Sequence, residues 1–138
     1  MNTSIMFGFF ACVLLGLEQF IRKIAGANQV NIPSYMMVNS LTFSAITILM
    51  NVVQKNSFDL EPRMAGLASL QAIIAAIGVF AMLLAFRLGG QGSIIFPIIA
   101  LGLIVSVPLS YIFFHEPITT TKMLGLGFGG TAIILLTR

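Results

Sequence analysis

The sequence predicts an all-α membrane protein, a bundle of five transmembrane helices, from its composition and from the spacing of its apolar runs. Of its 138 residues, 58% are hydrophobic and only 8% are charged, and the mean hydropathy is +1.04. A soluble domain of this length usually has about a quarter of its residues charged, and one core would not bury so much apolar surface. The composition therefore excludes an ordinary soluble enzyme. It also excludes a disordered chain, which would be polar and rich in charge.

Five apolar runs are long enough to cross the hydrocarbon core of a bilayer, which takes about 20 helical residues. Backbone groups in lipid must pair within their own segment, so runs of this length are expected to be helices. They also lack the alternation that is typical of barrel strands. We expect one domain, residues 1–138, with spans at residues 4–23, 32–53, 64–86, 92–114 and 119–137.

The first two spans have clear boundaries. The first ends at Arg22 and Lys23. The second begins with Asn31 as a candidate N-cap and has Pro33 in its first turn, where proline is favoured.

The remaining spans are separated by polar or glycine-rich segments. Residues 54–63 form the most hydrophilic stretch and predict a surface loop before the third span, which ends at Arg87. The fourth span follows a turn at residues 89–92. The fifth is the shortest, and it reaches across a bilayer if Lys122 extends its ammonium group to the interface.

The basic residues are distributed almost evenly over the two sides that five crossings define. One side carries Lys55, Arg63 and Lys122, and the other carries Arg22, Lys23, Arg87 and Arg138. An oriented membrane protein normally concentrates Lys and Arg on its cytoplasmic side. One interpretation is dual topology, in which oppositely oriented copies form an antiparallel dimer, the two-chain counterpart of an inverted repeat. The other is a single orientation in which Arg22 and Lys23 count weakly because they belong to the last turn of the first helix.

The C-terminal part carries a family pattern. Pro97 lies inside the fourth span, which ends in Phe113-Phe114-His115-Glu116-Pro117, and the last span contains Gly125-Leu-Gly-Phe-Gly-Gly. This pattern resembles an EamA-type domain of the drug/metabolite transporter superfamily, in which five helices make one repeat and most members carry two. The resemblance covers the five-span layout, has motif-level support from residues 91–136, and implies a transporter fold.

The chain departs from that family in having a single repeat and in having Glu18 in its first span. These departures leave the substrate class open. Small multidrug resistance proteins, four-helix relatives in the same superfamily, are similar in having one carboxylate in the first helix and in working as antiparallel dimers.

Glu18 is the only acidic residue inside any predicted span. At about 1.5 Å per residue it lies about 20 Å along the helix from Thr3, roughly two-thirds of the way across. An unpaired charge this deep costs about 3 kcal/mol, so such groups normally face a cavity or a partner. Two interpretations stay open. Glu18 is a proton, ion or substrate site, or it is neutralised by Arg22, one turn later on the same face.

The second span contains more polar side chains than a lipid-facing helix tolerates. Ser40, Ser44, Thr47 and Asn51 lie on one helical stripe, and the third span adds Gln71. These groups either line a substrate path or form hydrogen bonds between helices, worth about 0.6 kcal/mol each. Our candidates for the path are Tyr35, Asn39, Ser40, Ser44, Thr47 and Gln71.

Prolines and glycines in the last two spans suggest how the helices bend and pack. Pro97 and Pro108 each remove a backbone hydrogen bond from the fourth span, so they are candidate hinges for alternating access or, alternatively, fixed bends. Gly125 and Gly129 make a small-xxx-small step in the fifth span, which suits helix packing or a dimer contact.

One His, one Cys and four acidic residues do not make a convincing catalytic or metal-binding constellation. We therefore expect no enzyme activity, no cofactor and no metal site, and the scattered cations favour no nucleic-acid partner. The expected function is transport of small metabolites or amphipathic, cationic compounds across the inner (cytoplasmic) membrane. The transporter would couple to ions or protons and act by alternating access, as a homodimer or paired with a second five-helix subunit. The alternatives are a lipid-linked headgroup flippase subunit and a non-transporting scaffold or accessory subunit.

Overall fold

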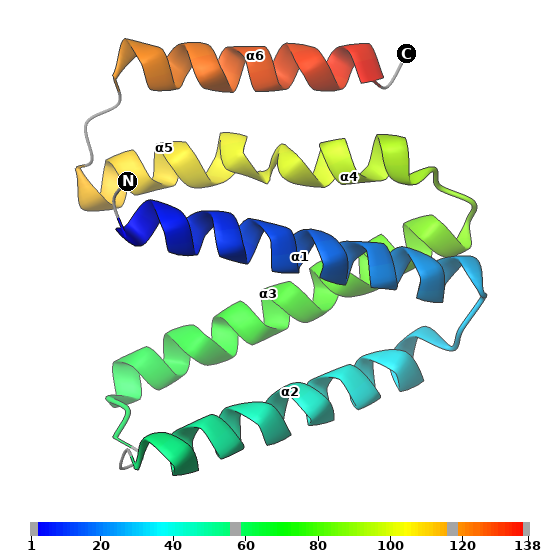
Figure 1. Ribbon diagram of the computed structural model, residues 1–138, viewed down its shortest axis with the longest axis vertical. Coiled ribbons are helices and arrows are strands. Elements are labelled where there is room, and N and C mark those ends of the chain that lie inside the picture. The colour runs from blue at the N-terminus through cyan, green and yellow to red at the C-terminus, as the bar shows by residue number, and fades with distance from the viewer. Residues whose placement is uncertain (1–2, 56–58, 116–118, 137–138) are drawn as a thin grey trace. The chain divides into compact units, whose positions relative to one another are not determined.

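The computed structural model describes residues 3–55, 59–115 and 119–136, and within these ranges every regular element is a helix. The helices are α1 (Thr3–Ala27), α2 (Ile32–Gln54), α3 (Pro62–Arg87), α4 (Gly92–Ala100), α5 (Gly102–Phe114) and α6 (Thr120–Leu136) (Figure 1). The chain divides into two compact units, Met1–Gly89 with α1 to α3 and Gly90–Arg138 with α4 to α6.

Four stretches are long and apolar enough to cross a membrane: α1, α2, α3 and the combined stretch Gly92–Phe114. Large hydrophobic side chains are exposed along most of their length. Such a surface is unfavourable in water and suits contact with lipid. The prediction of an all-helical chain is confirmed for the described residues, and the four stretches are compatible with a multi-pass membrane protein. The fifth predicted span forms α6, which at 17 residues is shorter than each of these four stretches.

The first two helices show how local sequence sets their ends. α1 continues to Ala27, beyond the predicted end at residue 23. Arg22 and Lys23 do not stop the helix, because arginine and lysine are good helix formers. α2 begins as predicted: Asn31 is its N-cap, and its Oδ1 accepts a hydrogen bond from the Ser34 N–H at 3.1 Å.

The core of the first unit lies where the C-terminal ends of α1 and α3 meet the start of α2. Ala25, Ile32 and Leu83 are buried together there. Gly26 makes the close approach possible, since a Cβ built on it would lie 2.6 Å from the Cβ of Phe86. α1 and α3 cross near this point and diverge toward their N-terminal ends (Figure 1).

The second unit interrupts the predicted fourth span at Leu101, one turn after Pro97. The Leu101 N–H is shared between the carbonyl oxygens of Pro97 and Ile98, at 3.2 and 3.1 Å, so the helix tightens there. α5 continues through Pro108 without a break. α6 runs alongside α4 and α5 in the opposite direction (Figure 1).

Candidate functional site

α1 turns a polar stripe toward the interior of its unit and an apolar surface outward. The partly buried side chains are Glu18, Gln19, Arg22 and Lys23, and the exposed ones between and beside them are Leu17, Phe20, Ile21 and Ile24. The stripe leads to Gly26, which contacts α3, so it lies on the side of α1 that faces α3. A lipid environment favours this arrangement, in which charged groups face inward and apolar groups face outward.

Glu18 and Arg22 form an ion pair within this stripe, with Arg22 Nη2 donating to Glu18 Oε1. The Arg22 side chain is only 16% exposed, and that of Glu18 is 42% exposed. An acid four residues before a base is the favourable order on a helix. The pairing that the sequence suggested is therefore present. A role for Glu18 in binding protons, ions or substrate stays a prediction.

The side-chain amide of Gln29 binds the end of α3 through both of its polar atoms. Its Nε2 donates to the carbonyl oxygen of Arg87 at 2.8 Å, and its Oε1 accepts from Arg87 Nε at 3.1 Å. Residues 29 and 87 lie 58 positions apart, so these bonds join the α1–α2 turn to the end of α3.

Gln29 also closes α1. It has φ of 56°, in the left-handed region where Gly or Asn is usual. Its N–H donates to the Gly26 carbonyl at 3.0 Å, and the Val30 N–H donates to the Ala25 carbonyl at 3.4 Å. This is a Schellman motif, which satisfies carbonyl groups that the end of a helix leaves unpaired.

The predicted polar groups of α2 lie mostly on the outside of the unit. The hydroxyls of Ser40 and Thr47 each donate to a carbonyl of their own helix at 2.9 Å. The side-chain amides of Asn39 and of Gln71 in α3 are exposed and make no hydrogen bond with any residue that the structure describes. Because unpaired amides are costly in lipid, both require a polar partner such as a wet cavity or another helix.

The remaining path candidates divide between the core and the surface. Tyr35 is partly buried and packs against the cluster of Ala25, Ile32 and Leu83, whereas Ser44 is exposed. Among the described residues, no hydrogen bond joins Glu18 to a side chain of α2. The structure therefore brings Glu18 together with Arg22 and does not bring it together with the polar groups of α2.

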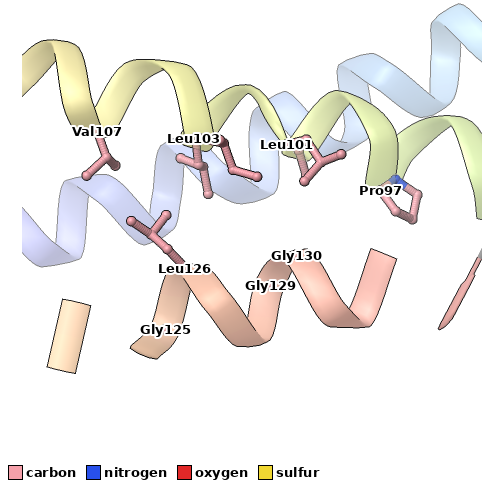
Figure 2. Close-up of a pocket in the computed structure, with 10 residues that line it drawn as sticks. Pro97, Leu101, Leu103, Val107, Gly125, Leu126, Gly129 and Gly130 are labelled. Carbon is pink, nitrogen blue, oxygen red and sulfur yellow. The ribbon is translucent and has the colours of Figure 1, made fainter. Parts of the chain in front are cut away.

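An apolar pocket of about 520 Å³ lies in the second unit between α4, α5 and α6 (Figure 2). It is lined by Pro97, Ala100, Leu101, Leu103, Ile104, Val107, Gly125, Leu126, Gly129 and Gly130. A Cβ built on Gly125 or Gly129 would meet no described atom within 4 Å. These two glycines therefore border open space in this chain. Pro97 borders the same pocket, and Pro108 is not among its lining residues.

Gln29, Gly26 and Lys23 were not among the predicted site residues. The stripe could have been found from the sequence, because one helix face within an apolar run contains Glu18, Gln19, Arg22 and Lys23. The Gln29–Arg87 contact could not have been found in this way, because it depends on how two helices meet. In the described ranges no group of three metal-ligating side chains exists. The interactions observed at this site are an ion pair and hydrogen bonds.

Comparison with known proteins finds an uncharacterized protein of Methanocaldococcus jannaschii that is 28% identical over 137 residues. The similarity covers 99% of this chain and 97% of that protein. No protein-family model matches the chain, and no solved structure matches it.

Proposed function

We propose that the protein is a membrane transporter of small metabolites or amphipathic cations, related to EamA-type carriers. The observation that carries this proposal is the inward polar stripe of α1. Four partly buried polar residues, Glu18, Gln19, Arg22 and Lys23, follow one another on a helix whose other face is apolar and exposed. Polar and charged groups inside a membrane helix are expensive and usually mark a pathway.

Glu18 is the proton or cation site in this proposal. Arg22 neutralises its carboxylate at rest, and a cationic substrate competes with Arg22 for that carboxylate. The carboxylate of Glu18 is already paired and partly buried, so a cationic substrate takes the place of an existing positive partner.

The proposed path also includes the amide of Asn39 on α2, which no hydrogen bond joins to Glu18 among the described residues. Glu18 lies nine residues before the end of α1, and Asn39 lies seven residues after the start of α2. At about 1.5 Å per residue these positions are about 14 and 10 Å from the turn that joins the two helices, so both lie at a similar depth. We propose that a second copy, or a second five-helix subunit, covers the exposed polar face of α2 and completes the path. In this arrangement α6 is the fifth crossing, and the dimer resides in the cytoplasmic membrane.

The test is uptake of tetraphenylphosphonium by proteoliposomes that contain the purified protein and an imposed pH gradient. Wild-type protein is expected to accumulate the probe only when the gradient is present. Glu18→Gln should abolish this uptake and leave expression and helix content intact. Glu61→Gln is the matched control, because Glu61 is an exposed acid at the start of α3 and lies outside the spans.

A double variant separates transport from simple charge neutralisation. Glu18→Gln alone leaves Arg22 without its partner, whereas Glu18→Gln with Arg22→Gln keeps the net charge of the stripe at its wild-type value. Loss of uptake in both variants assigns the carboxylate to transport. Recovery of uptake in the double variant would show that Glu18 serves only to neutralise Arg22.

Further measurements distinguish the alternative functions and assemblies. Transfer of a fluorescent lipid between the leaflets, without probe uptake, would favour a lipid-linked headgroup flippase. Absence of any flux together with a membrane protein that copurifies in fixed ratio would favour an accessory subunit. Reporter fusions at the C-terminus that are active on both sides of the membrane would support the antiparallel homodimer, and activity on one side only would discard it.

A further inference from the structure

The end of the first unit where α1 and α3 meet carries two cations that no described acid neutralises. Lys23 makes no ion pair or hydrogen bond with any described residue, and Arg87 uses only its Nε as a side-chain donor, to Gln29. Glu18 is occupied by Arg22. The other acids that the structure describes, Asp59 and Glu61, precede α3 and so lie at its opposite end.

The helix crossing brings these cations to the same place. Lys23 is one turn before Gly26 and shares its side of α1. The backbone nitrogen of Arg87 would lie 3.4 Å from a Cβ on Gly26. Partial burial of Lys23 agrees with a position on the side of α1 that faces α3. Both cations therefore lie within about one helical turn of the crossing point.

Arg87 is held in a fixed position. Its Nε donates to Gln29 Oε1, and Gln29 Nε2 donates back to the Arg87 carbonyl. The left-handed backbone of Gln29 closes α1 and places this side chain beside the end of α3. Neither Nη group of Arg87 donates to a residue that the structure describes, and a guanidinium presents such groups in the geometry that binds two phosphate oxygens.

The positive charge at this end is larger than the partial negative charge of the two helix C-termini. The C-terminal dipoles of α1 and α3 each correspond to roughly half a negative charge, so together they offset about one of the two positive charges. Apolar side chains stand directly beside the cations: Ile24 is 48% exposed and Leu88 is 80% exposed. A phosphate on an acyl-chain lipid matches both the surplus positive charge and the neighbouring apolar surface.

We infer that Lys23 and Arg87 form a binding site for the phosphate group of an anionic lipid at this membrane surface. The inference rests on the α1–α3 crossing and does not depend on transport. Gln29 is the positioning residue of the site, because it fixes the guanidinium of Arg87.

The test uses the full-length protein in detergent, titrated with phosphatidylglycerol and, separately, with phosphatidylcholine, and native mass spectrometry counts the bound lipids. Phosphatidylglycerol is expected to bind more tightly than phosphatidylcholine. Lys23→Gln and Arg87→Gln should each weaken its binding by about fivefold, the contribution of one cation near a membrane surface. Arg87→Lys keeps the charge but loses the bond from Nε to Gln29, so it should retain only part of the affinity.

The control and the competing ligand make the outcome decisive. Lys55→Gln removes an exposed cation at the far end of α2 and should leave the affinity unchanged. Equal binding of the two lipids, or an equal loss in Lys55→Gln and Lys23→Gln, would overturn the site. Competition by inorganic phosphate would support recognition of the phosphate group. Binding of inorganic phosphate without binding of phosphatidylglycerol would make the lipid assignment wrong. Lys23 has no described partner, so Lys23→Gln remains informative even if Arg87→Gln fails to fold.

Discussion

Gly26 of α1 lies so close to Phe86 of α3 that a Cβ on Gly26 would be 2.6 Å from the Cβ of Phe86 and 3.0 Å from the carbonyl oxygen of Leu83. Real Cβ atoms do not approach other atoms this closely, and the nearest atoms are at or next to the backbone of α3, where they cannot turn away. The absence of a side chain at position 26 therefore sets the distance between the two helices. It also places the polar stripe of α1 beside α3.

Gly26→Ala is expected to destabilise the first unit by about 1–3 kcal/mol, because the added methyl group forces the crossing helices apart. Thermal unfolding in detergent, followed by circular dichroism, measures the effect. Gly78→Ala is the control on α3, since a Cβ at Gly78 meets no described atom within 4 Å. That variant should be neutral or stabilising by up to about 1 kcal/mol. Equal losses of stability in the two variants would contradict a tight crossing at Gly26.

Gln29→Ala and Gln29→Gly separate backbone strain from side-chain bonding. Both variants lose the two hydrogen bonds to Arg87, but only glycine adopts the φ of 56° without steric cost. We expect Gln29→Ala to be less stable than Gln29→Gly by about 1–2 kcal/mol, the steric cost of a left-handed residue with a Cβ. Chemical unfolding in mild detergent measures the difference. Identical stabilities would show that the left-handed conformation at position 29 carries no strain.

Asn31→Ala is expected to cost about 1 kcal/mol, because Asn31 Oδ1 caps α2 through the Ser34 N–H. Asn31→Asp retains an acceptor and should keep most of the stability. Ser34→Ala removes only the 3.0 Å hydroxyl contact to the same oxygen, so its effect should be smaller than that of Asn31→Ala. If Asn31→Ala unfolds at the same temperature as the wild type, the cap adds nothing to the stability of the fold.

Phe20 and Ala25 test which face of α1 meets lipid. Phe20 is 53% exposed, whereas Ala25 is 6% exposed. In a Cys12→Ser background, Phe20→Cys should react readily with a lipid-soluble photoactivated thiol label in membranes, and Ala25→Cys should react poorly. The yield of labelled protein, read by mass spectrometry, checks this. Stronger labelling at position 25 would reverse the orientation of α1.

Several features of the fold were predictable because they depend on local sequence. The long apolar runs define α1, α2, α3 and the stretch Gly92–Phe114, since length and hydropathy are properties of a segment alone. The cap at Asn31 was predictable for the same reason, because its bonds reach only to Ser34. The ion pair of Glu18 with Arg22 spans one helical turn and was also visible in the residue spacing.

The exact ends and interruptions of the helices were harder to predict from the sequence. α1 extends past Arg22 and Lys23 because both residues are good helix formers. The interruption at Leu101 follows Pro97, although α5 passes through Pro108 unbroken. One proline was accommodated within its helix and the other was followed by a break. The segment composition around the two residues did not distinguish these outcomes.

The amino-acid sequence by itself determined that this chain is helical, apolar enough for a membrane, and polar along one face of its first span, because hydropathy and helical period are local. Only the tertiary structure decided that Gly26 meets Phe86 and that Gln29 holds Arg87, since each contact joins residues far apart in the chain. Those contacts arise where two helix surfaces fit together, and such a fit depends on the shapes of both surfaces at once.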